Sequence, residues 1–194
     1  LKEAVVQGSL NMLPVILVLT FIFVPSVSAR IFSTQSCVGY PYDYRTQKEI
    51  YFLRGDLSVI CYDTPEHTKL VSLMWFFACI WPIGVVALYI LLLYPCKEPI
   101  LLGKKTKLVE ATSFLTNDYE RHVFFWEPFE LFRRTALTGW VLLIEEKYSF
   151  VRLLIGLLLS LSFMVALLST KPYVRPEDDL LAIVSQLLLV ALFF

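Results

Sequence analysis

The sequence contains only two histidines, four cysteines and seven glycines among its 194 residues, and this scarcity excludes several kinds of site. His67 and His122 lie in separate polar segments, so they form no pair for a metal or a catalytic triad, and we expect both to be solvated loop residues. No Cys-x-x-Cys pair occurs, and the scattered glycines form no phosphate-binding loop. The sequence therefore predicts neither an enzyme nor a bound cofactor.

Charge of one sign is also lacking, because 17 basic residues balance 17 acidic ones. A balanced chain is atypical of nucleic-acid-binding proteins and of polyacidic tails. In contrast, 57% of the residues are hydrophobic and the mean hydropathy is +0.67, which is too apolar for a soluble globular domain. The composition predicts an integral membrane protein whose first partner is the lipid bilayer, and 29 aromatic residues (15 Phe, 10 Tyr and 4 Trp) fit repeated crossings of its interfaces.

Apolar stretches predict an all-α, multi-pass bundle of about five membrane-spanning helices. The expected spans are residues 9–27, 70–94, 124–144, 150–169 and 180–194. Together they form one transmembrane module over residues 1–194. The start at Leu1 and the apolar end suggest a fragment of a larger protein. The first stretch has an alternative interpretation as a signal peptide, since Val27-Ser28-Ala29 resembles a cleavage site.

Two spans carry internal features that predict how they pack. In the second span, Trp81, Pro82 and Gly84 predict a helix kink, because proline removes a backbone donor and glycine allows a neighbour to approach closely. In the last span, Gln186 is the one strongly hydrogen-bonding side chain, so we expect it to face a neighbouring helix.

The polar loops predict the orientation of the chain. Cys37 and Cys61 lie in the long loop 30–68, which favours a disulfide on an extracytoplasmic side, although two free thiols in a cytosolic loop remain the alternative. Within that loop we interpret residues 54–56, Arg-Gly-Asp, as a turn.

The connector 95–123 holds the densest basic cluster, Lys104, Lys105 and Lys107, which predicts a cytoplasmic location. Glu145 then falls on the same outer side as Cys61. The cluster could also attract anionic lipid, and an ordinary stop-transfer signal is the simpler interpretation.

The stretch 124–144 is apolar enough to enter a membrane, yet it carries Glu127, Glu130, Arg133 and Arg134. A charge at membrane depth costs at least about 2.5–3.5 kcal/mol on insertion scales, so it needs a partner. Glu130 precedes the two arginines by three and four residues, the spacings at which helical side chains meet. We therefore predict an intramembrane charge network.

A different arrangement of this stretch stays open, in which residues 119–134 lie along the membrane surface and a short re-entrant segment follows. The spanning model makes a specific prediction. Glu130→Ala should destabilise the protein, and joint replacement of Glu130 and Arg134 by apolar residues should partly restore stability.

Several short segments occur in a specific order along nearly the whole chain. They are Pro25-Ser26-Val27-Ser28 with Ile31-Phe32 and Cys37, Leu53 with Asp56-Leu57-Ser58 and Cys61, Trp81-Pro82-Ile83-Gly84, Trp126-Glu127 with Glu130 and Arg133-Arg134, and Lys171-Pro172-Tyr173. Together they resemble a transmembrane module of protists and algae called TRP-like, loosely similar to fungal TRP-like and polycystin-type channels. The resemblance implies the C-terminal membrane region of a larger protein, a Cys37–Cys61 disulfide, and a Glu/Arg helix inside the bundle.

The function expected from this resemblance is that of a channel or sensor subunit in a plasma or ciliary membrane. Its partners would be the bilayer and other helices of the same chain or of a homo-oligomer. We expect it to bind no nucleic acid. The chain contains no pore loop or filter-like run. A structural anchor for an extracellular domain or scaffold subunit is therefore the alternative, and a seven-helix receptor is a third.

Overall fold

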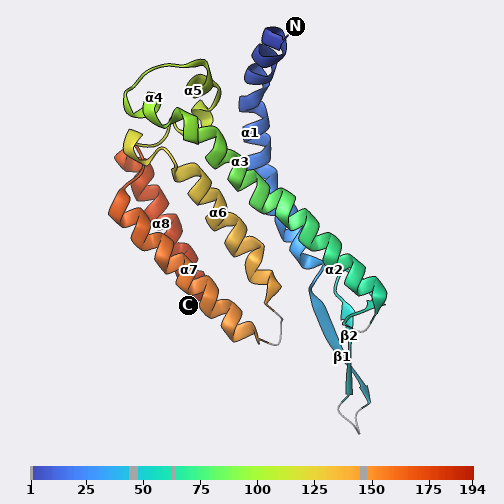
Figure 1. The fold of residues 1–194 in the computed structure, drawn as a ribbon. Helices are drawn as coiled ribbons and strands as arrows, with labels where there is room; N and C mark the ends of the chain where they lie inside the picture. The colour runs from blue at the N-terminus through green and yellow to red at the C-terminus, as the bar shows by residue number, and fades with distance from the viewer. Residues whose placement is uncertain (1, 44–47, 63, 145–147) are drawn as a thin grey trace.

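The computed structural model describes all residues except 1, 44–47, 63 and 145–147, and the described part is mostly helical with one small sheet. Figure 1 shows two groups of long helices with α6 between them, and the sheet projecting from one end. Helix α1 and the α2–α3 helix lie on one side of α6, and α7 and α8 lie on the other. The two short connector helices α4 and α5 lie at the end opposite the sheet.

Helix α1 (Lys2–Ser33) is longer than the predicted first span and contains Pro14 and Pro25. Its segment Leu10–Ser33 is long and apolar enough to cross a membrane. A hydrogen bond inside an apolar core joins this helix to the helix that contains Tyr89: the buried Tyr89 hydroxyl donates to the Leu17 carbonyl at 2.8 Å. Ser28, from the alternative cleavage motif, lies within this helix and is fully buried.

The second candidate span, Pro65–Leu101, is built from several consecutive helical segments. These are α2 (Pro65–Ala78), a π-helical turn (Cys79–Ile83), α3 (Gly84–Leu93), a 3-10 turn (Tyr94–Cys96) and α4 (Lys97–Leu101). The π turn coincides with the predicted kink and contains Pro82. Proline has no N–H and its ring would collide with the carbonyl four residues earlier, so a wider turn accommodates it.

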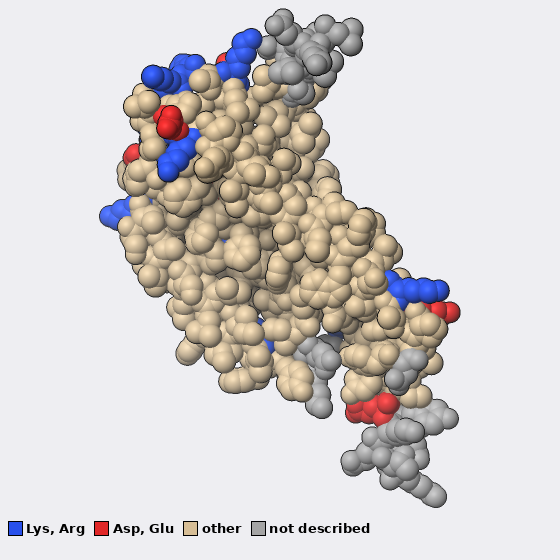
Figure 2. Space-filling view, in the orientation of Figure 1, with Lys and Arg blue, Asp and Glu red and all other residues tan. Residues whose placement is uncertain are grey.

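The connector that follows consists of short helical pieces. They are α5 (Lys107–Ala111) and two 3-10 turns (Ser113–Leu115 and Arg121–Val123). An isolated β-bridge pairs Tyr119 of this connector with Tyr173. Lys104 and Lys105 lie exposed in the loop before α5, and Lys107 begins that helix after Thr106 caps it. Figure 2 shows Lys and Arg side chains gathered at this end of the molecule.

The predicted third span is not one continuous helix. Helix α6 (Trp126–Thr138) ends at Gly139, and residues Trp140–Leu143 form a 3-10 turn. The break coincides with close packing, because a β-carbon at Gly139 would lie 2.7 Å from the buried Phe32 ring and 2.9 Å from the Thr135 carbonyl oxygen. A residue without a side chain lets this turn contact α1 directly.

Helix α7 (Ser149–Thr170) agrees with the predicted fourth span, and α8 (Pro176–Phe193) with the fifth stretch. Among the described residues, three helices are long and apolar enough to cross a membrane, namely Leu10–Ser33, Pro65–Leu101 and Ser149–Thr170. Five spans are therefore not shown: α6 is only 13 residues long, and the first turn of α8 carries Glu177, Asp178 and Asp179.

The expectation of an all-α fold is wrong for the loop 30–68, which forms a three-stranded antiparallel sheet. Strands β1 (Cys37–Asp43), β2 (Lys48–Leu53) and β3 (Asp56–Ile60) follow one another in the order β1-β2-β3. The turn predicted at residues 54–56 is confirmed at 54–55, between β2 and β3. β-Branched and aromatic residues in these strands, such as Val38, Tyr40, Ile50, Tyr51 and Phe52, are typical of β structure.

The disulfide between Cys37 and Cys61 is confirmed, with a Cα–Cα distance of 6.4 Å. It joins the start of β1 to the residue after β3, so it closes the sheet across β2. The sheet and Ile144 lie at the same end of the bundle, opposite the Lys104–Lys107 segment. Glu145, predicted to share the side of Cys61, lies outside the described residues.

The close approach at Gly139 leads to a testable prediction. Gly139→Ala should destabilise the protein by about 1–3 kcal/mol, because the added methyl overlaps both the Phe32 ring and the Thr135 carbonyl. Gly8→Ala is the matched control, since nothing lies within 4 Å of a β-carbon there and alanine favours the helix by up to about 1 kcal/mol. Thermal unfolding in detergent measures both. Equal stability of the two variants would contradict the packing argument.

Candidate functional site

The charged residues of α6 form a compact ion-pair network centred on Glu130. Its carboxylate accepts hydrogen bonds from Arg133 through Nε at 3.0 Å and through Nη2, and from Arg134 Nε at 3.1 Å. Because these residues are three and four positions apart, a single helix brings them together. One carboxylate therefore holds two guanidinium groups.

The two arginines differ in how deeply they lie. The Arg133 side chain is 13% exposed and that of Glu130 15%, whereas that of Arg134 is 42% exposed. Arg134 also lies over the Phe21 ring of α1, with 4.6 Å between its guanidinium carbon and the ring centroid. Such cation–π contacts are favourable, so Arg134 links α6 to α1. Arg133 instead donates both of its described hydrogen bonds to Glu130.

Glu127, predicted as a member of the same network, has a different partner. It is buried, and the Tyr119 hydroxyl from the connector donates a hydrogen bond to its carboxylate. Burial, and then the nearby Glu127 carboxylate, raise the pKa of Tyr119, so the phenol stays neutral and remains a donor. The Tyr119 ring packs against Tyr173, 5.2 Å between centroids, which ties the connector to the α7–α8 link.

The Glu130 network borders a cavity between α6, α7 and α8. The cavity has a volume of about 600 Å³, and Glu130, Arg133 and Arg134 all line it. Phe163 and Leu167 of α7 form an apolar wall, and one face of α8 supplies Ala182, Ser185, Gln186 and Leu189. Asp118 and Asp178 also line it. The charges therefore face a space that can hold water, an ion or a polar ligand group.

Hydrogen-bonding groups around this cavity are not all satisfied within the described part of the protein. Gln186 is 4% exposed, and its amide donates to the Ser160 carbonyl of α7 at 2.8 Å, which confirms that it faces a neighbouring helix. Trp126 lines the cavity, and its buried indole N–H has no acceptor among the described residues. A buried donor without a partner is costly, so water or a ligand acceptor in the cavity would stabilise it.

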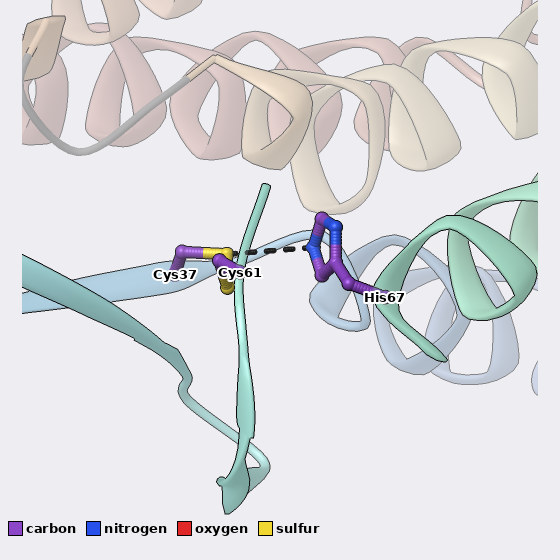
Figure 3. A group of neighbouring side chains, drawn as sticks. All are labelled: Cys37, Cys61 and His67. Atoms are coloured by element: carbon purple, nitrogen blue, oxygen red, sulfur yellow. Dashed lines mark hydrogen bonds between the residues drawn. A yellow bond between two sulfur atoms is a disulfide. The ribbon is translucent and has the colours of Figure 1, made fainter. Parts of the chain in front are cut away.

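A second group of side chains meets at the other end of the molecule, beside the sheet. Figure 3 shows His67 of α2 facing the Cys37–Cys61 disulfide, with 3.6 Å between His67 Nε2 and Cys37 Sγ. The prediction that His67 is a solvated loop residue is wrong, because it lies in the first turn of α2 and is 6% exposed. His122, in contrast, is exposed in the connector.

The other predicted site residues lie elsewhere. Trp81, Pro82 and Gly84 are in the α2–α3 helix, where Trp81 packs against the core cluster around Tyr89. Lys104 and Lys105 border a separate open pocket of about 640 Å³ in the connector, together with Arg121. Neither set reaches the cavity beside α6.

Sequence reasoning missed Tyr119, Asp118, Tyr173 and Asp178, which lie beside the α6 charges although the chain places them in loops or at a helix start. A bridge brings the two loops together: the Pro172 carbonyl accepts from Glu120 N–H at 2.8 Å, and the Asp118 carbonyl from Val174 N–H at 3.1 Å. No local pattern predicts a pairing between segments so far apart. The only available signal was the need of buried charges for partners.

Comparison with known proteins adds no relative, since no family model, no curated protein and no solved structure matches this chain.

Proposed function

We propose that this chain is a TRP-like channel or sensor subunit, in which the cavity between α6, α7 and α8 forms a hydrated polar pathway or stimulus-binding space inside the bundle. The observation that carries the proposal is that Glu130, Arg133 and Arg134 line a cavity of about 600 Å³ instead of being sealed by apolar side chains. Charged side chains at membrane depth characteristically mark ion pathways, relays and sensors.

The depth of the charges supports this proposal. Phe129 of α6 packs against Phe163 of α7 with 4.4 Å between ring centroids, and α7 ends at Thr170. At about 1.5 Å per residue, Phe163 lies roughly 10 Å along the helix axis from that end. Glu130 and Arg133 follow Phe129 toward the centre of the bundle, so they would lie inside the hydrocarbon layer if α7 spans it. This favours an inserted α6 over a helix on the membrane surface.

The anchor function has its own supporting observation. Glu130 pairs with both arginines within one helix, and Glu127 pairs with Tyr119. Satisfied pairs of this kind are sufficient to explain the charges as structural interactions with no role in transport. The two functions differ in whether water reaches the cavity and whether solutes pass.

Cysteine accessibility tests the hydrated cavity. In a C79S/C96S background, Ser185→Cys should react with a water-soluble thiol reagent, because Ser185 lines the cavity. Leu187→Cys is the matched control. It is two residues away on α8 and therefore about 200° around the helix. Leu187 is exposed on the outer surface of the chain and does not line the cavity. We expect at least tenfold faster labelling at residue 185. Similar rates would leave only the anchor function.

Ion flux in proteoliposomes tests conduction. We expect a cation or anion flux above that of empty vesicles, and a clear change in rate or selectivity for Glu130→Gln, which removes one charge from the cavity lining. Glu110→Gln, on the exposed end of α5, should leave the flux unchanged. A protein that is folded but conducts nothing, while Ser185→Cys is labelled, would indicate a sensor rather than a channel.

A further inference from the structure

Three side chains that can each coordinate a metal meet beside the sheet. The Cys37 and Cys61 sulfurs and a ring nitrogen of His67 all lie within 4.8 Å of one another. Cys61 is 3% exposed and His67 6% exposed, so the group is shielded from bulk solvent. Two sulfurs and one imidazole form a ligand set that suits zinc and related transition metals.

The fold holds the imidazole in a defined orientation. Thr64 caps α2 by accepting a hydrogen bond from the His67 N–H, which places this residue in the first turn. The Tyr62 N–H then donates to His67 Nδ1 at 3.4 Å, so the other ring nitrogen points at Cys37 Sγ. The ring is therefore aimed at the sulfurs by two backbone groups.

The separation of Cys37 Sγ and His67 Nε2 matches the dimensions of a tetrahedral metal site. With Zn–S near 2.3 Å and Zn–N near 2.0–2.1 Å, tetrahedral angles give a sulfur-to-nitrogen distance of about 3.6 Å and a sulfur-to-sulfur distance of about 3.8 Å. The observed distance from Cys37 Sγ to His67 Nε2 is 3.6 Å. Reduction would let the two sulfurs separate toward this spacing.

We propose that Cys37, Cys61 and His67 form a redox-gated site for a zinc-class divalent ion, which binds only when the disulfide is reduced. A dithiol reductant supplies two electrons and two protons, which cleave the S–S bond to two thiols, and the reductant itself becomes a disulfide. Binding of the ion then releases two protons as both sulfurs become thiolates. Reoxidation by a small disulfide, which takes up the two electrons and two protons from water to become two thiols, removes both thiolate ligands and expels the ion.

Space for a fourth ligand lies next to the group. Cys37 and His67 border a pocket of about 270 Å³, which is large enough for water on the metal. Gln35 lines the same pocket, and its buried amide oxygen accepts no hydrogen bond within the described part of the chain. It is suited to accept one from a metal-bound water.

Metal binding requires the imidazole proton of His67 to move from one ring nitrogen to the other. A disulfide sulfur only accepts, and Nδ1 accepts from Tyr62, so the proton of the neutral ring lies on Nε2. Coordination through Nε2 moves it to Nδ1, where it faces the Tyr62 N–H, so the contact is lost and the Tyr62 backbone must shift. At 3.4 Å that contact is long for a hydrogen bond, so its loss is small beside a metal–ligand bond.

Cobalt(II) titration tests the proposal on the purified chain in detergent. In a C79S/C96S background, which removes the two free cysteines, the reduced protein should bind one Co²⁺ and develop thiolate-to-cobalt charge-transfer and tetrahedral ligand-field absorption. The oxidised protein should develop neither. Zn²⁺ should displace the cobalt, and an oxidant that reforms the disulfide should abolish the spectrum.

His67→Ala should weaken cobalt binding at least roughly tenfold, since even outer-sphere partners cost 10–100-fold, whereas His122→Ala should leave it unchanged. Circular dichroism of oxidised His67→Ala checks its folding, and His67→Gln provides a second variant. Equal cobalt affinity in wild type and both His67 variants would overturn the proposal, as would binding by the oxidised protein. Failure of the reduced protein to bind metal, with or without loss of helicity, would overturn it too.

Discussion

Replacing Glu130 by alanine should destabilise the folded protein by up to about 3–5 kcal/mol, because it leaves the partly buried Arg133 guanidinium without its carboxylate. The Arg133 side chain is 13% exposed and donates twice to Glu130, so water in the cavity beside α6 replaces the lost carboxylate only in part. Chemical denaturation in mixed micelles, followed by circular dichroism, measures the loss. Glu110→Ala, an exposed site in α5, should change stability by less than about 0.5 kcal/mol.

The double variants identify the partner that matters. The double variant Glu130→Leu/Arg133→Met should recover at least half of the stability lost in Glu130→Ala, because it leaves no unpaired charge at Arg133. Glu130→Leu/Arg134→Leu should recover little. Arg134 is 42% exposed and contacts Phe21, so its removal leaves the deeper arginine unpaired. From sequence we expected Arg134 to be the compensating partner, and the deeper burial of Arg133 now leads us to expect that role for Arg133. Equal recovery in both pairs would refute the difference in burial as the cause.

Removing the disulfide by Cys37→Ala/Cys61→Ala should cost on the order of 3 kcal/mol in the absence of metal, from the chain entropy of a loop with a sequence separation of 24. The loss should be local, because the disulfide closes the sheet and does not connect the helices of the bundle. Hydrogen exchange should therefore accelerate in β1, β2 and β3 and leave α7 and α8 unchanged.

Cys79→Ala is the control for this experiment, because Cys79 is an exposed free cysteine. It should change neither the stability nor the exchange pattern. Accelerated exchange in α7 or α8 after removal of the disulfide would show that the sheet supports the whole bundle. An unchanged rate in the strands would show that their backbone pairing is sufficient without the bond.

Much of the fold follows from local patterns. A helix that crosses a membrane needs about 20 apolar residues, so composition alone located all three apolar helices, with Ser149–Thr170 matching its predicted bounds almost residue for residue. The Glu130 contacts are equally local, since spacings of three and four residues meet on any helix. The strands were missed although Lys48–Leu53 is rich in β-formers, because the loop was interpreted by polarity alone.

Other features depend on segments that are distant in the chain. Helix α6 ends at Gly139 where Phe32 of α1 packs against it, Glu127 pairs with Tyr119 instead of an arginine, and His67 lies against a disulfide formed 30 residues earlier in the chain at Cys37. Periodicity describes which face of an element is apolar, but it carries no information on which other element covers that face. Partner choice, burial depth and the cavity beside α6 arise when the elements pack, because each depends on atoms contributed by several helices at once.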